Sequence, residues 1–292
     1  MLRLPVTTRF APSPSGPLHV GHLLAACEAR RLATLHGGRC LLRIEDIDTA
    51  RTRNPEWVRL MLQDLVWLGL AFDGEVMVQS RRFGVYAAVL EQLRQRGLLY
   101  PCFCTRAEIR ARQEEISRAP HGCPAARYPG TCRALPPELV QEKLAAGVPH
   151  AWRVNMRRVE DSIGCPLWED LRRGVQRCVP SACDDAVLAR KDAPVAYHLA
   201  VVVDDAAQGV SLVTRGEDLF EATHIHRALQ GALGLPVPQY CHHRLLCDAS
   251  GKRLAKRDGA RSIASLRAAG WSPQRLLDSL QAALRRGGRW EE

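Results

Sequence analysis

Apolar and polar positions along the chain change period from one segment to the next, and the periods predict short strands that alternate with helices. The segment from Leu2 to Phe10 is typical of a strand, and the proline-rich stretch 11–17 ends it because proline has no backbone N–H to donate. Helical spacing follows from Leu18 to Leu35 and stops at two glycines. A second strand is predicted from Arg39 to Ile44.

Two more helices are predicted after the second strand. Asn54 and Pro55 form a cap and first-turn pair for a helix through Leu68, and a helix from Arg82 to Arg96 ends before Gly97. The order strand, helix, strand, helix is typical of a parallel sheet with helical crossovers. The pattern therefore predicts an α/β fold.

The amino-acid composition indicates how large a hydrophobic core the chain can form and which sign its net charge has. The chain has 292 residues, of which 46% are hydrophobic, and this excludes a largely disordered protein. Lys and Arg number 41 against 31 acids, and the net charge of +10 favours an anionic partner such as nucleic acid. Only four of the cations are lysines, so a genome-wide preference for arginine explains the excess equally well.

Neither a signal peptide nor a membrane span is indicated by the apolar runs, so a cytoplasmic protein with no membrane partner is expected. The eleven cysteines are an odd number, which favours buried thiols or metal ligands over a disulfide framework.

Candidate chemistry lies where the predicted strands end. Ligands of parallel sheets bind at the carboxyl ends of strands, and the segments 9–13 and 45–46 both fall there. His19 and His22 lie on the first turn of a helix, whose free N–H groups suit a phosphate, and Gly21 between them lets a nucleotide approach the backbone. Taken alone, two solvated histidines at a helix terminus explain this pattern equally well.

A basic loop follows near the other end, from Gly251 to Arg257. It holds two of the four lysines, Lys252 and Lys256, and lysine is a compact cation suited to a polyphosphate. In isolation a solvated basic turn is the simpler interpretation.

Four ordered segments together resemble a known family. These are residues 9–22 (RFAPSPSGPLHVGH), 42–48 (LRIEDID), 201–205 (VVVDD) followed by 215–219 (RGEDL), and the loop around Lys256. In this order they resemble the class I aminoacyl-tRNA synthetases of the glutamyl type. The resemblance implies a Rossmann-type parallel-sheet, nucleotide-binding catalytic domain with a zinc-bearing insertion and a short helical C-terminal part.

The resemblance also implies ATP-dependent activation of glutamate, with Mg²⁺ accompanying the ATP, and transfer of glutamate to an RNA hydroxyl. The implied glutamate-binding residues are Arg9, Ala11, Ser13, Glu45, Tyr197 and Arg215. The implied ATP-binding residues are His19, Gly21, His22 and Lys256, and the implied catalytic residues are His19, His22 and Lys256. The competing interpretation of Glu45 and Arg215 is a set of surface ion pairs.

The loop departs from the K-M-S-K-S pattern that the family commonly shows. Residues 253–257 keep the second lysine as Lys256 but replace the first with Arg253 and lose both serines. This departure leaves the roles of Arg253 and Arg257 open.

A structural zinc site is also implied by the resemblance. Its ligands would be Cys102, Cys104, Tyr128 and Cys132. Thiolates at this spacing suit tetrahedral zinc, and four ligands leave no position for catalysis. Cys123 is a rival fourth ligand, His121 is a weaker one, and free thiols without metal are the alternative.

The predicted organisation is a first half of the catalytic domain (1–100), a zinc-bearing insertion (101–189), a second half (190–245) and the loop with C-terminal helices (246–292). Only 36 residues follow Lys256 (292 − 256), so no anticodon-binding domain is expected. From Gly251 onward ten cations and four acids give a net charge of +6, which suits an RNA stem or an ordinary solvated helix face.

Short members of the family activate glutamate without tRNA and attach it to the queuosine base in the anticodon of tRNA(Asp). The resemblance to them implies queuosine-bearing tRNA(Asp), glutamate and ATP as partners of a monomer. A compact enzyme that charges a tRNA 3′ end, and a non-catalytic RNA-binding paralogue, are the two alternatives.

Overall fold

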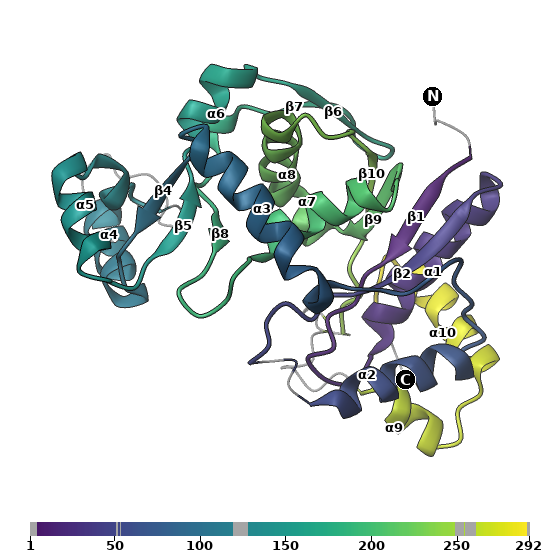
Figure 1. Cartoon of the computed structure of the whole chain (residues 1–292). Coiled ribbons are helices and arrows are strands. Elements are labelled where there is room, and N and C mark those ends of the chain that lie inside the picture. Colours follow the sequence, from purple (N-terminus) through teal and green to yellow (C-terminus); the bar gives the residue numbers. More distant parts are fainter. Residues whose placement is uncertain are drawn as a thin grey trace.

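The computed structural model describes residues 5–50, 52, 54–118, 128–248, 254 and 261–290, and the side chains of 115–118 are not described. Within this part the strands form three sheets (Figure 1). The first is β1 (Thr7–Phe10), β2 (Arg39–Ile44) and β3 (Met77–Val78), all parallel. The second has the order β7 (Gly174–Arg177), β6 (Leu167–Asp170), β10 (Gln239–His243) and β9 (Leu212–Gly216). The third is antiparallel, with β5 (Ala151–Val154) between β4 (Leu99–Cys102) and β8 (Val187–Ala189).

The first two sheets meet between β1 and β9. The backbone N–H of Ser211 donates to the carbonyl of Thr7 at 3.0 Å, and the N–H of Thr7 donates to the Ser211 hydroxyl at 2.9 Å. In the second sheet β10 runs parallel to both β6 and β9, whereas β7 is antiparallel to β6. The predicted parallel α/β arrangement is confirmed, and the carboxyl ends of β1, β2 and β9 come together.

The helices lie around these sheets (Figure 1). The α-helices are α1 (Val20–Leu35), α2 (Pro55–Trp67), α3 (Phe83–Gln95), α4 (Arg106–Arg118), α5 (Pro137–Ala145), α6 (Met156–Ile163), α7 (Tyr197–Ala207), α8 (Phe220–Leu233), α9 (Ile263–Ala268) and α10 (Pro273–Arg285). Four short 3-10 turns are η1 (Gln79–Arg82), η2 (Thr131–Ala134), η3 (Pro180–Ala182) and η4 (Glu217–Leu219).

Local signals set most of the predicted boundaries. The second strand has the predicted bounds, and the Asn54 side chain accepts from the N–H of Glu56 at 3.0 Å to cap α2. Of the strand predicted over residues 2–10, Thr7–Phe10 is a strand, Pro5 before it has no N–H for a ladder, and residues 2–4 lie outside the described part.

The C-terminal helices share a core with the N-terminal ones. Leu276 and Leu280 of α10 are buried in the cluster that holds Leu24 of α1 and Leu65 of α2. Trp271 also packs there, with its ring 6.5 Å from that of Trp290. These helices therefore complete the packing of the first sheet.

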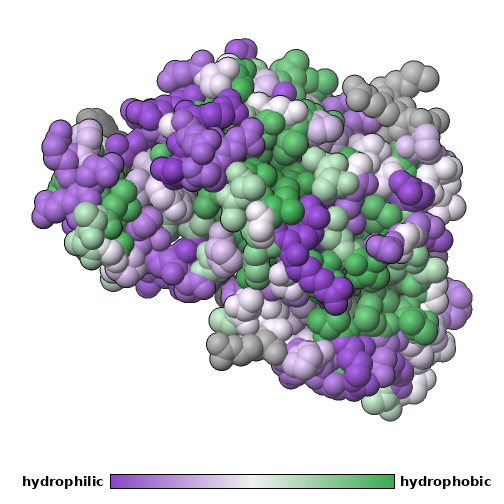
Figure 2. All heavy atoms as spheres, viewed as in Figure 1, coloured by the Kyte–Doolittle hydropathy of each residue, from purple (hydrophilic) through white to green (hydrophobic). Residues whose placement is uncertain are grey.

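The third sheet, with α4 and α5, projects at the left of Figure 1. A small cluster of Tyr100, Cys102, Tyr128 and Cys132 forms its buried centre. Figure 2 shows that this part is mostly hydrophilic outside, whereas apolar side chains gather over the region of α1 and β2. Within the described residues no helix combines the length and apolarity needed to cross a bilayer.

Candidate active site

Two buried arginines share one carboxylate beneath the strand ends. Arg9 of β1 donates through Nε to Asp205 Oδ1 at 3.0 Å, and Arg43 of β2 donates through Nη1 to the same oxygen at 2.8 Å. Burial alone would raise the pKa of Asp205, but the two guanidinium groups hold it below its usual value. Arg9 also donates to the carbonyl of Thr214 at 3.0 Å, which ties β1 to β9.

Glu45 follows β2 at the same edge. Its Oε1 lies 3.3 Å from Arg43 Nη2, and its backbone N–H donates to the carbonyl of Pro12 at 3.0 Å. Burial raises the pKa of this carboxyl against the opposing effect of Arg43 and Arg9. Ala11 is half-buried in the same turn after β1.

Arg215 of β9 is only 6% exposed, so it forms no surface ion pair. Its Nε lies 3.2 Å from His242 Nε2, its Nη1 lies 3.0 Å from His226 Nδ1, and its Nη2 donates to Thr223 Oγ1. The strand register places His242 of β10 opposite Arg215. Thr223 and His226 lie one turn apart on α8, so both reach the same guanidinium.

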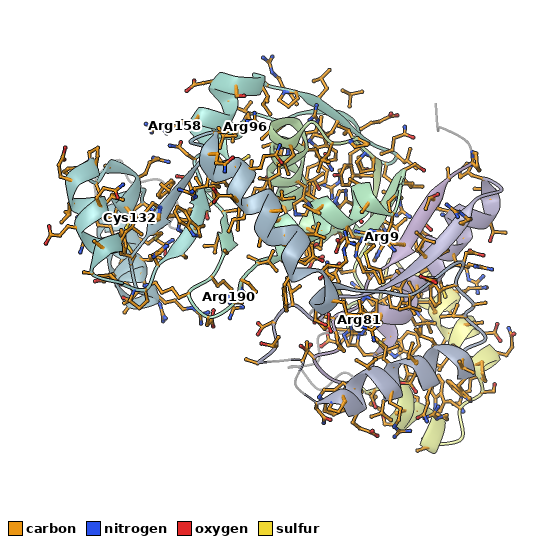
Figure 3. The ribbon with its side chains drawn as sticks, viewed as in Figure 1. Arg9, Arg81, Arg96, Cys132, Arg158 and Arg190 are labelled. Carbon is orange, nitrogen blue, oxygen red and sulfur yellow. The ribbon has the colours of Figure 1, made fainter. Side chains whose placement is uncertain are left out.

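A cavity of about 940 Å³ opens between the sheets and the projecting part. Ser13, Glu45, Gln79, Tyr197 and His198 line it on the catalytic side. Residues from the projecting part and the loop after β8 also line it, namely Cys104, Arg106, Arg153, Arg190 and Lys191. In Figure 3, Arg190 lies beside the loop after β8, and Arg9 lies at the junction of the first two sheets.

The predicted glutamate-binding residues fall into two groups. Ser13, Glu45 and Tyr197 line the cavity, whereas Arg9 and Arg215 are buried and are not among its lining residues. Burial raises the pKa of the Tyr197 hydroxyl, and the charges of Arg215 and Arg9 act on it in the opposite direction. Both guanidinium groups therefore act electrostatically on a residue that lines the cavity.

The two predicted histidines cap the N-terminus of α1. His19 Nδ1 accepts from the N–H of Gly21 at 3.1 Å, and His22 Nδ1 accepts from the N–H of His19 at 3.1 Å. A Cβ on Gly21 would lie 2.8 Å from the His19 ring, so the glycine is required by the cap itself as well as by any nucleotide. His19 also forms a β-bridge with Ser262, just before α9.

Lys256 and the other residues of its loop, apart from Leu254, lie outside the described residues. Leu254 and the segment after the loop are described. Leu254 N donates to Leu246 O at 2.8 Å, and Ile263 N donates to Leu18 O at 2.8 Å. The second contact brings the chain just beyond the loop to the residue before His19.

Three thiols and a phenol converge at the centre of the projecting part. The Sγ atoms of Cys102, Cys104 and Cys132 all lie within 4.8 Å of one another, and the Tyr128 hydroxyl lies 3.4 Å from Cys102 Sγ and 3.6 Å from Cys104 Sγ. Hydrogen bonding from Cys102 lowers the pKa of Cys132 to about 6. Four S and O donors at these separations fit a tetrahedral metal ion with metal–sulfur bonds of about 2.3 Å.

The rival ligands Cys123 and His121 lie outside the described residues. None of the ten described cysteines forms a disulfide with another described residue. Figure 3 places Cys132 in the projecting part, well away from Arg9.

Several residues of the site were not singled out from the sequence. They are Arg43, Gln79, Asp170, His198, Asp205, Thr223, His226 and His242. Asp205 and Arg43 stand inside the quoted motifs, but no role was assigned to them. The spacing of three residues between Thr223 and His226 was the available signal that both lie on one face of a helix.

Comparison with known proteins now identifies the class. Residues 5–290 match the model of the family described as tRNA synthetases class I (E and Q), catalytic domain. The chain belongs to this family and is an enzyme of the ligase class. It is 49% identical over 272 residues to the glutamyl-Q tRNA(Asp) synthetase of Rhodobacter capsulatus, covering 91% of this chain and 96% of that one.

A second relative and a solved structure agree with this placement. The chain is 45% identical over 276 residues to the glutamyl-Q tRNA(Asp) synthetase of Nocardia farcinica, covering 94% of this chain and 84% of that one. It is also similar to the crystal structure of a glutamate tRNA ligase from Elizabethkingia meningosepticum in complex with its amino acid, with a TM-score of 0.73 and 31% identity. That match covers 87% of this chain and 52% of the ligase, so the chain spans about half of the ligase's length.

Proposed function

We propose that the chain activates glutamate with ATP, in the absence of tRNA, and transfers it to the queuosine base in the anticodon of tRNA(Asp). Activation joins the α-carboxylate to the α-phosphate of ATP and releases pyrophosphate. The names of the two relatives at 49% and 45% identity support this choice of acceptor.

The observation that carries the proposal is the pair of buried arginines on the adjoining strands β1 and β9. Arg9 and Arg215 supply two cations for an amino acid with two carboxylates, and Glu45 in the cavity accepts from its α-ammonium group. Ser13 and the Tyr197 hydroxyl complete the lining. A neutral side chain would leave the buried guanidinium of Arg215 without a counter-charge, and glutamate is therefore preferred.

The N-terminus of α1 is the proposed site for the triphosphate. His19 and His22 are fixed there by the reciprocal cap, and the helix dipole favours negative charge. We assign Lys256 to the same role from the family motif. Stabilising charge on a pre-positioned triphosphate is the main requirement of this chemistry, and Mg²⁺ would enter as the partner of ATP.

The thiol cluster is proposed to hold one structural zinc ion. Cys102, Cys104, Tyr128 and Cys132 would be its ligands. When bound, the ion would cross-link β4 to η2 and stabilise the wall of the cavity to which Cys104 contributes.

A transfer experiment tests the acceptor. Radiolabelled glutamate, ATP and the purified protein are incubated with separated tRNAs from cells that make queuosine and from cells that do not. Label on tRNA(Asp) only from the first cells supports the proposal. Label on tRNA(Glu) from both would identify an enzyme that charges the 3′ end instead.

A second assay tests the activation step. Glutamate-dependent pyrophosphate exchange without RNA is expected. Its absence, together with no labelled tRNA, would contradict both enzymatic functions.

A further inference from the structure

Arg215 is a buried cation whose hydrogen bonds go to neutral groups. Within the described part of the chain no carboxylate forms an ion pair with it, whereas Arg9 is bound to Asp205 at 3.0 Å. A buried charge without a counter-charge destabilises the fold. The missing negative charge is therefore expected from a ligand.

The chemistry of the contacts fixes the protons on the two rings. A guanidinium only donates hydrogen bonds, so the ring nitrogens that face Arg215 are unprotonated acceptors. In neutral His226 the proton then lies on Nε2, 3.1 Å from Nδ1 of His198. In neutral His242 it lies on Nδ1, 2.6 Å from Asp170 Oδ2.

The surroundings keep both rings neutral. Burial, reinforced by the charge of Arg215, lowers the pKa of His226 well below its usual value. Burial also lowers the pKa of His242 to about 4, although Asp170 acts in the opposite direction. Near neutral pH both rings can therefore accept from Arg215.

The donors left on Arg215 match a carboxylate. A guanidinium has five N–H groups, and the three hydrogen bonds use one each on Nε, Nη1 and Nη2, which leaves one hydrogen on each terminal nitrogen. Two N–H groups of a planar cation suit the two oxygens of a carboxylate.

We propose that His226 and His242 are positioning residues that orient Arg215 toward the side-chain carboxylate of the amino-acid substrate and so select it over the corresponding amide. This inference rests on the proposed function and deepens it. Helix α8 supplies His226 and the strand register supplies His242, so both contacts belong to the framework of the fold.

Substitution of His226 tests the positioning role. His226→Leu removes both ring nitrogens, and the KM for glutamate is expected to rise about tenfold or more because a hydrogen bond to a charged group is lost. The kcat and the KM for ATP should change by less than about threefold, since their contacts are untouched. The preference for glutamate over glutamine should fall.

Conservative and matched variants separate this effect from general damage. His226→Gln again offers an acceptor and an N–H, and it should restore most of the glutamate affinity. His224→Leu is the control, because His224 lies on the same helix and contacts Trp168 Nε1 at 3.4 Å, with no contact to Arg215. Its glutamate KM should stay at the wild-type value.

If His226→Leu fails to fold, a second pair of variants tests the positioning of Arg215. Thr223→Val keeps the shape of the side chain but removes the acceptor of Arg215 Nη2, whereas Thr223→Ser keeps the hydroxyl. The glutamate KM should rise in the valine variant and not in the serine variant. Unchanged values in all the folded variants would overturn the proposal.

The ring protons provide a readout that does not depend on activity. Two-bond proton–nitrogen NMR spectra of the histidine rings should show His226 protonated at Nε2 and His242 at Nδ1. The opposite tautomers, or doubly protonated rings near neutral pH, would overturn the proposal even if glutamate activation were confirmed. Expected tautomers in a protein without glutamate-dependent exchange would instead refute the proposed function alone.

Discussion

Asp205 receives hydrogen bonds from two arginines that come from different strands. Arg43 has no exposed surface, and both arginines donate to one oxygen of the carboxylate. Removing one partner of a buried ion pair costs more than the pair contributes, because the remaining charge stays away from water. The stability of the contact between strands β1 and β2 and helix α7 therefore depends on the side chain of Asp205.

Asp205→Asn is expected to lower the free energy of unfolding by about 3–5 kcal/mol, since buried Arg9 loses its counter-charge and buried Arg43 keeps only Glu45. Urea denaturation measures this. Asp192→Asn is the control, because Asp192 pairs with Arg190 at the surface and its side chain is 64% exposed. Its loss should be below about 1 kcal/mol. Equal losses in the two variants would contradict the argument.

Low pH should reduce the contribution of Asp205 to the stability of the fold. The folded-state pKa of Asp205 is lowered, so its contribution to stability is complete above the ordinary carboxyl pKa of about 4 and disappears as pH falls through the depressed value. The asparagine variant has no such group. Its stability, measured by urea denaturation at several pH values, should fall less steeply in acid than that of the wild type.

At the scale of single elements, the N-terminus of α1 is built by its own side chains. His19 and His22 each satisfy a backbone N–H of the first turn, and the ring of His19 occupies the space beside Gly21. The rings lie 3.9 Å apart, centroid to centroid. A side chain at position 21 would therefore displace the ring of His19, a proposed ATP-binding residue, even in the absence of a nucleotide.

Gly21→Ala should separate activity from stability. The better helix propensity of alanine, about 1 kcal/mol, offsets a weakened cap of similar size, so the free energy of unfolding should change little. Pyrophosphate exchange should fall about tenfold or more as His19 moves. Gly84→Ala on α3 is the control, because a Cβ there has no neighbour within 4 Å, and its exchange rate should not change.

The thiol cluster of the projecting part likewise links single elements, β4 and η2, through its proposed zinc ion. Cys132→Ser should reduce bound zinc from about one ion per chain to well below that, measured by elemental analysis, because one of four ligands is weakened. Hydrogen exchange should increase in β4 and η2 more than in β1 or β9. Cys27→Ser on α1, outside the cluster, should keep the metal. Zinc retained at the wild-type level in Cys132→Ser would contradict the assignment.

At the scale of the whole molecule, local sequence patterns predicted the contacts between distant elements less well than they predicted the bounds of single elements. Residues 39–44 and the Asn54 cap carry their signals in a few neighbouring positions, and they were predicted correctly. The contacts of Asp205 with Arg9 and of His226 with Arg215 depend on which buried surfaces meet, and periodicity does not encode that choice. Motif resemblance named Arg9 and Arg215, but only the fold shows that both are buried and that neither is among the residues lining the cavity.

The basic residues near the C-terminal end predict how the affinity for tRNA depends on salt concentration. Arg285 at the end of α10 and Arg286 and Arg289 beyond it are exposed. If they contact three phosphates, replacing all three with Gln should reduce the slope of log affinity for tRNA against log salt by about 2–3. Filter binding at several salt concentrations measures the slope.

A control with the same change in net charge keeps this test specific. Arg31, Arg59 and Arg94 are exposed and pair with glutamates on their own helices. Their replacement with Gln should leave the slope near the wild-type value. Equal slopes for the two triple variants would exclude a specific RNA contact by the C-terminal end.

The sharing of Asp205 also has a consequence for biosynthesis. Arg9 leaves the ribosome 196 residues before its partner, and Arg43 leaves 162 residues before it. At about 5–20 residues per second, the N-terminal strands wait roughly 10–40 s for that carboxylate. Leu276 and Leu280, which fill the same N-terminal core, are synthesised later still. The nascent first half therefore carries Arg9 without its carboxylate partner and an open apolar surface for most of translation, and we expect it to engage chaperones until α10 is released.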